Sequence, residues 1–220
     1  MNFVLALYCV LFPKIKPEEM ECLRWNDRCF YECKRKGRIG DTLNSFNTMF
    51  GTENAKNRLK DNALDVNEEL SKKLNAFRHS YHSAANFIPF PGSLNYSKDY
   101  DTTGWNYLGD FWDIKLKIIK DEWDKIIDNS SSVPLLHMNR SYFQKFSSFD
   151  EYCRYMFLEY YLNPRTGEVI SLCNHDGNIK LPKPFDKVSC ENYIDNSTSI
   201  MKLRGAAMGE CLYNIMKEFS

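Results

Sequence analysis

Apolar residues recur along much of the chain at intervals of three and four positions, the spacing that places side chains on one face of an α-helix. The longest such run predicts a helix over residues 105–128, with an apolar face formed by Trp105, Leu108, Trp112, Leu116, Ile119, Trp123 and Ile126. A face this wide is typical of a helix packed against a hydrophobic core. The same spacing predicts helices over residues 62–86 and 193–218, with apolar faces formed by Leu70, Leu74, Phe77, Tyr81 and Ala85 and by Ile200, Leu203, Ala207, Cys211 and Ile215.

Helix end signals predict two further helices. Pro17 suits the first turn of a helix over residues 17–36, and Gly37 suits its end. Ser148 and Glu151 have the spacing of a capping box at the start of an aromatic-rich helix. In the last helix, Gly205 and Gly209 are destabilising unless another helix packs closely against them.

Two short segments have the composition of strands, EVISLC at residues 168–173 and KVSCENYI at residues 187–194. The sequence therefore predicts a mainly α protein, a single helical domain of about five or six helices with a small β element near residues 168–190. We expect one domain over residues 1–220. Within it, residues 62–218 form the core, and residues 1–60 are a candidate N-terminal helical extension.

The composition narrows the classes of partner. The 29 basic and 29 acidic residues give a formal net charge of zero. Overall charge therefore does not favour a nucleic-acid or nucleotide partner, although a local basic patch stays open. The N-terminal run MNFVLALYCVLFPK is too short to span a membrane and lacks the basic start of a secretory signal. We interpret it as a buried strand or short helix, with a signal segment as the alternative, and expect no membrane association.

The eight cysteines are compatible with either a secreted or a cytoplasmic protein. An even number of cysteines and several N-x-S/T sequons fit a secreted, disulfide-bonded protein. A chain of this length does not need disulfides, and the sequence contains no C-x-x-C pair, so we favour a reduced, cytoplasmic protein. Cys22, Cys29 and Cys33 would share one helix face, where core packing is favoured over metal ligation. We expect no metal and no cofactor.

The segment RHSYHSAANFIPFPGSLN, residues 78–95, has the most unusual composition. Arg78 and His82 are four residues apart and would share a helix face, where they could bind phosphate. His82 could also act as an acid or a base near neutral pH. We therefore name His82, Arg78 and Asp113 as candidate catalytic residues. Candidate ligand-binding residues are Asn86, Asn95, Asp110 and Arg204.

The structural alternative is a helix end and turn that fixes the chain against the 105–128 helix. In that case the side chains of His82 and Asn86 form hydrogen bonds with backbone groups. Asp113 would lie on a solvated flank beside Lys117, an i,i+4 pair of the kind that Asp121 would also form with Lys125. Arg204 would pair with an inward carboxylate such as Asp113 or lie at the surface.

Several short motifs together resemble an uncharacterised family of bacterial proteins. In order along the chain they are HSAANFIPFPGSLN, DFWDIKLKII, FDEYCRYMFLEYYL, PFD and KLRG, between about residues 78 and 210. The resemblance places His82, Phe87, Pro91, Asn95, Asp110, Asp113 and Arg204 on patterned positions. Ala85 departs from the family's usual glycine, and residues 98–101 replace an Arg-Gly turn. The family has no established activity. The resemblance therefore singles out these residue positions and implies a bacterial cytoplasmic protein, but it implies no reaction.

Two classes of function are compatible with these observations. The common catalytic signatures are absent and aromatic residues, which often anchor interfaces, are abundant, so we expect a binding or regulatory protein with a protein partner. A phage-defence or toxin–antitoxin system is the setting we favour. The alternative is a metal-independent ribonuclease, or another enzyme acting on a phosphate-containing substrate, through Arg78 and His82. The sequence indicates no oligomeric state.

Overall fold

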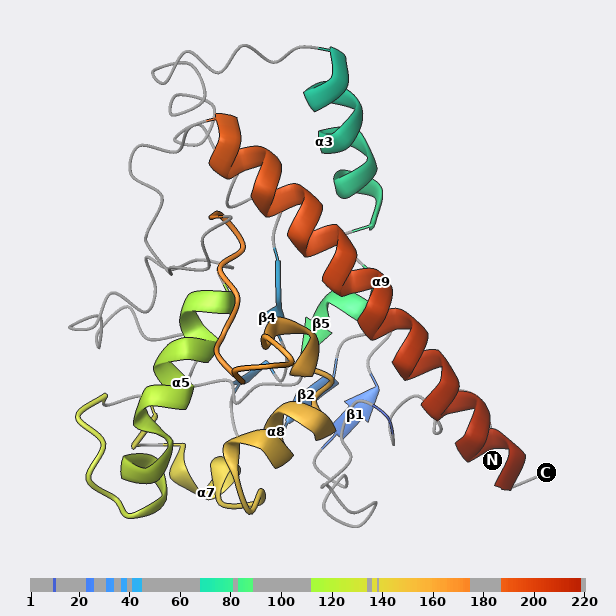
Figure 1. Ribbon diagram of the computed structural model, residues 1–220. Coiled ribbons are helices and arrows are strands. Elements are labelled where there is room, and N and C mark those ends of the chain that lie inside the picture. Colours follow the sequence, from blue (N-terminus) through green and yellow to red (C-terminus); the bar gives the residue numbers. More distant parts are fainter. Residues whose placement is uncertain are drawn as a thin grey trace.

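The computed structural model describes residues 10, 23–25, 31–33, 37–38, 41–44, 68–80, 83–88, 112–133, 136–137, 139–174 and 187–218. Most of these residues are helical (Figure 1). The α-helices are α3 (Glu68–Ser80), α5 (Trp112–Ile127), α7 (Arg140–Phe143), α8 (Phe149–Tyr155) and α9 (Lys187–Glu218). Two 3₁₀ turns, η3 (Ala84–Asn86) and η6 (Glu159–Tyr161), accompany them. The predicted mainly α fold class is confirmed.

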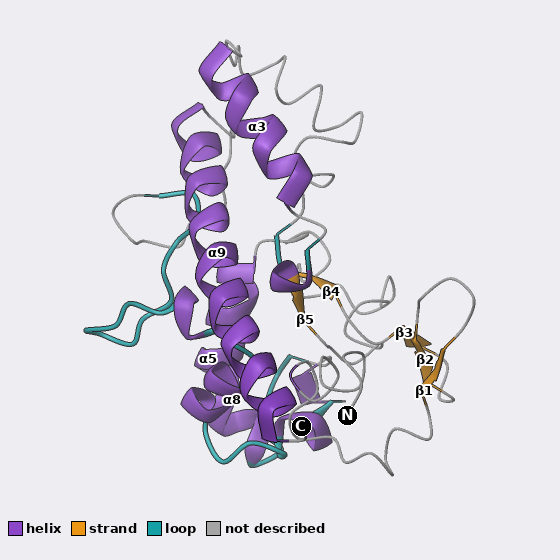
Figure 2. Ribbon diagram, turned by 90° about the vertical axis from the view of Figure 1, so that its right-hand side faces the viewer, coloured by secondary structure: helices purple, strands orange, loops and turns teal. Residues whose placement is uncertain are grey.

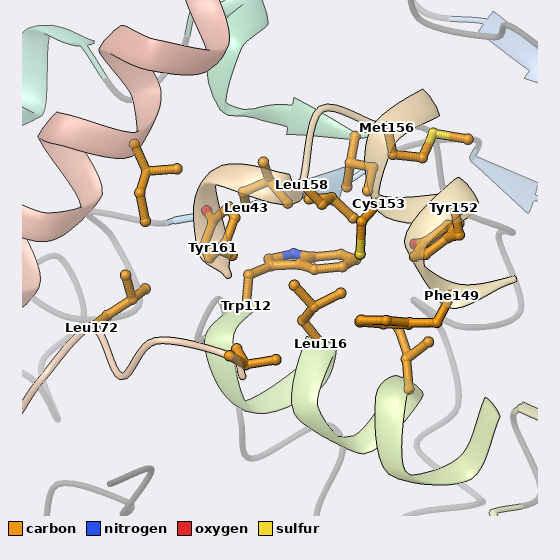
Figure 3. Close-up of a cluster of buried hydrophobic side chains, with 14 of the residues drawn as sticks. Leu43, Trp112, Leu116, Phe149, Tyr152, Cys153, Met156, Leu158, Tyr161 and Leu172 are labelled. Atoms are coloured by element: carbon orange, nitrogen blue, oxygen red, sulfur yellow. The ribbon is translucent and has the colours of Figure 1, made fainter. Parts of the chain in front are cut away.

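The hydrophobic core is centred on the apolar face of α5. The predicted face residues Trp112, Leu116, Ile119, Trp123 and Ile126 are all buried. Figure 3 shows the Trp112 indole in the middle of the cluster, with Leu116 on one side and Cys153 and Leu158 on the other. About three turns further along α5, the Trp123 ring contacts the rings of Phe143, Phe149 and Tyr152 with centroids 5.7–5.9 Å apart. The core therefore joins α5 to α7 and α8.

The long helix α9 crosses the molecule and carries two earlier segments against it (Figure 1). The rings of Phe77 in α3 and Tyr193 in α9 meet edge to face at 5.9 Å. At the margin of this contact, Lys73 Nζ lies 2.8 Å from a carboxylate oxygen of Asp195. Further along α9, η3 packs so closely that a Cβ on Gly205 would lie 3.3 Å from the Ala85 Cβ. This close approach is the packing reason that the sequence required for a glycine inside the helix.

The strands form two small antiparallel sheets. In the first, β1 (Leu23–Trp25), β2 (Tyr31–Cys33) and β3 (Gly37–Arg38) are neighbours in chain order. It lies to one side of the helices (Figure 2). In the second, β4 (Asp41–Thr42) pairs with β5 (Phe87–Ile88), so the segment that follows α3 is fixed to residues more than 40 positions earlier.

The strands correct two sequence predictions. The helix expected over residues 17–36, and with it the helical N-terminal extension, is wrong where β1 and β2 form, with Leu23 opposite Cys33 and Trp25 opposite Tyr31. Tryptophan and tyrosine favour strands, and this pairing outweighs the helical spacing of the apolar residues. The strand expected over residues 187–194 is also wrong, because these residues begin α9. Near residue 168 the β element is a single bridge between Leu162 and Val169.

The buried face of α9 differs from the predicted one. Ile200 is buried as expected, but Leu203 is 49 % exposed, whereas the neighbouring Arg204 and Met208 are buried. The sequence assigned the face by hydrophobicity, and the helix is rotated because the Arg204 side chain has polar partners inside the protein.

Candidate functional site

Arg204 lies at the centre of a buried polar cluster between α9, η3 and the end of α8. Its side chain is enclosed, and among the described residues it donates to four backbone carbonyl groups. Nε donates to the Phe157 oxygen at 2.8 Å, and Nη2 donates to the Met156 oxygen at 3.0 Å and to the Phe87 oxygen at 3.3 Å. Nη1 donates to the Ala85 oxygen. One guanidinium therefore ties together three segments that are far apart in the sequence.

This arrangement differs from both sequence interpretations of Arg204, which placed it at the surface or beside Asp113. Its hydrogen-bond partners are carbonyl oxygens, so burial lowers the pKa of Arg204 to about 10. The negative charge of Glu159 acts in the opposite direction and favours the protonated guanidinium. With four carbonyl bonds made, the guanidinium has little remaining capacity to bind an anionic ligand.

Arg204 also fixes an uncommon backbone conformation. Phe157 has a φ of 54°, in the left-handed region that residues other than glycine rarely adopt. The carbonyl groups of Met156 and Phe157, on either side of this turn, both accept from Arg204. The arginine therefore determines how the chain leaves α8 and where Phe157 lies.

Asn86 forms a second buried network with Asn44 and Tyr161. The Asn86 Oδ1 atom accepts from the Asn44 backbone N–H at 3.0 Å, and Asn86 Nδ2 donates to the Asn44 carbonyl at 2.6 Å. Asn44 Nδ2 in turn donates to the Tyr161 hydroxyl at 2.7 Å. Asn86 was a candidate ligand-binding residue. Its side chain is 1 % exposed and joins β4, η3 and η6, as the structural interpretation of the segment expected.

Asp113, a candidate catalytic residue, is buried in the first turn of α5. It is 2 % exposed, so the expected solvated flank is wrong. Its Oδ2 atom accepts from the Leu172 backbone N–H at 2.8 Å and thereby holds the segment after Val169 against the helix. Lys117 pairs with Asp121 at 2.7 Å and Lys125 with Glu122, so neither predicted i,i+4 pair forms.

Burial sets the protonation of Asp113. Loss of solvation raises the pKa of this carboxyl to about 6, although the Leu172 amide favours the charged form. The carboxyl is closed off from solvent and engaged by the backbone, an environment that suits a structural group.

Of the remaining candidate residues, one lies at the surface and three lie outside the described residues. Arg78 is exposed in the last turn of α3. His82, Asn95 and Asp110 lie outside the described residues. The convergence of Arg78 and His82 in one catalytic site, and with it the ribonuclease alternative, therefore stays a prediction.

The turn predicted over residues 78–95 contacts other elements than expected. In its described part, β5 pairs with β4, and η3 packs on α9 at Gly205. Sequence analysis expected this turn to pack against the 105–128 helix. The turn instead provides the Ala85 and Phe87 carbonyl groups that Arg204 binds.

A partly open pocket of about 470 Å³ lies between α8 and the C-terminal part of α9. Its lining residues are Val10, Glu151, Arg154, Tyr155, Phe157, Cys211 and Ile215. Most of these side chains are apolar or aromatic, and Tyr155 is 37 % exposed. We call this pocket the α8–α9 groove. Val10 is the part of the apolar N-terminal run that the structure describes, and it is buried here.

Sequence analysis did not identify the groove as a site. It did place Cys211 and Ile215 on one apolar face of the last helix, and both line the groove. In the predicted aromatic-rich helix, the apolar stripe consists of Phe149, Tyr152, Met156 and Tyr160; the first three are buried and Tyr160 is partly buried. Arg154 and Tyr155 lie between these residues and are exposed. Sequence analysis did not select them, because they do not continue the helical spacing of the apolar residues.

The chemistry of the described residues is otherwise limited. Within those residues, no three His, Cys, Asp or Glu side chains are grouped closely enough to hold a metal ion. Cys153, Cys173, Cys190 and Cys211 are free thiols, and burial raises the pKa of Cys153 and Cys211. None of the described helices combines the length and the apolar character that a bilayer span requires.

Comparison with known proteins identifies a family. Residues 18–208 match the sequence model of the family of unknown function DUF6994. This agrees with the resemblance to an uncharacterised family, although the match does not test the individual motifs. No curated protein and no solved structure matches the chain.

Proposed function

The chain belongs to the family of unknown function DUF6994, and on the basis of its own structure we propose that it is a non-catalytic binding protein that holds a partner protein in the α8–α9 groove. The single observation that carries this proposal is the contrast between two sets of residues. The catalytic candidate Asp113 and the ligand-binding candidates Asn86 and Arg204 are buried, and each is hydrogen-bonded to backbone groups. The groove residues Arg154 and Tyr155 face solvent.

The groove fits an apolar segment of a protein. Its volume of about 470 Å³ accommodates a few side chains, and its aromatic and aliphatic lining suits an apolar anchor. An amphipathic helix laid between two helices is a common way to fill such a site. Arg154 is exposed where it lines the groove, so its charge can meet a carboxylate of a ligand.

These features specify the partner's chemistry. It presents apolar side chains that enter between Tyr155 and Ile215, with a carboxylate placed to meet Arg154. Arg154 supplies specificity and an early electrostatic attraction, whereas the apolar lining supplies most of the binding free energy. The protein works in the bacterial cytoplasm under this proposal, in a phage-defence or toxin–antitoxin system, and the genes beside it test that setting.

A photo-crosslinking amino acid at position 155 tests the proposal in the producing cell. We expect it to capture one protein, identified by mass spectrometry, and the purified protein to bind the unmodified chain. Ile215→Glu should abolish the capture, because it places a charge in the groove. The same crosslinker at exposed His137, away from the groove, is the matched control. Equal capture from both positions, or capture unaffected by Ile215→Glu, contradicts the proposal.

A further inference from the structure

Over a long stretch of α9, one face has no other described element against it apart from the contact of Lys73 in α3 with Asp195. Asp195, Lys202, Ala206, Glu210 and Lys217 are all exposed. Because successive residues turn by 100° around a helix, the other four lie within about 40° of the direction of Ala206, on a single strip. The helix crosses the front of the molecule in Figure 1 with no other described element drawn over this part of it.

The charges on this strip are self-complementary about Ala206. Lys202 and Glu210 are each four residues from Ala206, on opposite sides, and Asp195 and Lys217 are each eleven residues from it. If a second copy of α9 lies antiparallel with the two Ala206 residues opposite each other, every charge on the strip meets one of opposite sign. Twofold symmetry makes each of these pairs occur twice.

The apolar and small residues of the strip have the same symmetry. Leu203 and Gly209 are each three residues from Ala206 and flank the strip on its two edges. Leu203 is 49 % exposed and would add apolar contact at the edge of the interface, and a Cβ on Gly209 would meet nothing within 4 Å, so Gly209 leaves open space there. Ala206 at the centre allows the two helices to approach closely. Tyr213, 65 % exposed, would cover Ser199 of the other copy at each end.

From this symmetry we propose that the exposed strip of α9 is the interface of a homodimer in which two copies of the chain pair their α9 helices antiparallel about Ala206. Within the described residues, Lys202 and Glu210 form no ion pair with their own chain, and the second copy supplies their partners. Asp195 also pairs with Lys73, so the outer pair contributes less than the central one.

The dimer is separate from the α8–α9 groove and goes beyond the proposed function. Ile215, which lines the groove, is nine residues from Ala206 and therefore points to the opposite side of α9. Both surfaces can be occupied at once. The contact spans about 33 Å of helix, which is short for a protein interface, so we expect a dissociation constant on the order of micromolar.

Charge reversal tests the pairing on the full chain by sedimentation velocity over a range of concentrations. Lys202→Glu places two carboxylates opposite each other at both ends of the central contact, and Glu210→Lys does the same with two cations. Each single variant should weaken dimerisation at least about tenfold. The double variant Lys202→Glu with Glu210→Lys should dimerise again, because it restores opposite charges.

The matched control is Asp124→Lys, a charge reversal on the exposed side of α5, which should leave dimerisation unchanged. Thermal unfolding of each variant verifies that the monomer is folded. Three results overturn the proposal: a monomeric wild-type chain at concentrations of several hundred micromolar, single variants that dimerise like the wild type, or a double variant that stays monomeric. None of these outcomes tests the proposed binding of a partner protein in the α8–α9 groove.

Discussion

The guanidinium of Arg204 makes four hydrogen bonds to backbone carbonyl groups. It binds carbonyl oxygens from the segment after α3 and from the turn after α8, so it holds both against α9. The turn it fixes contains Phe157, which lines the α8–α9 groove. Arg204 is therefore a positioning residue for the proposed binding site, which it shapes without touching the ligand.

Replacing this arginine should unfold the protein readily. Arg204→Met keeps much of the volume but leaves four carbonyl groups without their donor, and we expect the free energy of unfolding to fall by roughly 3–5 kcal/mol. Urea denaturation measures the change. Arg165→Met, at an exposed arginine in a turn, is the matched control and should change stability by less than about 0.5 kcal/mol. Similar values for the two variants would show that the buried bonds contribute little.

Asp113 should make the protein more stable in mild acid. Its pKa is about 6 in the folded protein, above the ordinary value of 3.8 expected after unfolding. The folded state therefore binds a proton that the unfolded state does not, between about pH 4 and 6. The contribution of Asp113 to stability is full below this range and is lost as the pH rises through it, by roughly 3 kcal/mol in total.

Asp113→Asn isolates this contribution, because asparagine cannot titrate and its oxygen can still accept from Leu172. The free energy of unfolding of the variant minus that of the wild type should increase between pH 4 and pH 7. All other titrating groups are common to both proteins and cancel. A difference that is constant with pH, measured by urea denaturation, would mean that the carboxyl titrates normally in the folded state.

The apolar face of helix α5 lies within the buried core. Trp112 is fully buried at its start, among side chains from α8, η6 and Leu43 (Figure 3). Trp112→Ala should therefore lower the free energy of unfolding by roughly 3–5 kcal/mol. Val188→Ala, at a side chain that is 59 % exposed, is the control and should have little effect. A loss below about 1 kcal/mol for Trp112→Ala would contradict the central role of this helix.

The two glycines of α9 should respond differently to substitution. Gly209→Ala adds a Cβ in open space and removes the helix penalty of glycine, so it should stabilise the monomer by about 1 kcal/mol. Gly205→Val places branched methyl groups where a Cβ alone already lies 3.3 Å from Ala85, so it should destabilise the protein. Thermal unfolding at low protein concentration compares them. Equal effects would mean that η3 does not pack on Gly205 as described.

The sequence predicted a helix correctly where the helical pattern depends on residues that are close together in the chain. The α5 face was correct at every described position because its apolar spacing is local and uninterrupted. The pairing of β1 with β2 was missed because it depends on contacts between different segments. The burial of Arg204 was missed for the same reason, since its partners are backbone groups, which every sequence has. The groove was missed because it forms where two helices meet.

At the scale of the molecule, the described residues form a buried helical core with two exposed surfaces on opposite sides of α9. The groove side carries Arg154 and Tyr155, and the strip centred on Ala206 carries the self-complementary charges. A homodimer through the strip would present two grooves facing away from the interface. A partner that is itself dimeric would then bind with increased avidity.

The most direct test of the binding function is an isothermal titration of the purified partner, identified by crosslinking, into the Arg154→Glu variant. The variant reverses the charge that we expect to meet a carboxylate on the partner. We predict that it weakens binding at least about tenfold, whereas Arg165→Glu, at an exposed arginine away from the groove, leaves affinity within about twofold. Equal affinity for Arg154→Glu and Arg165→Glu would contradict the claim that the protein acts through the α8–α9 groove.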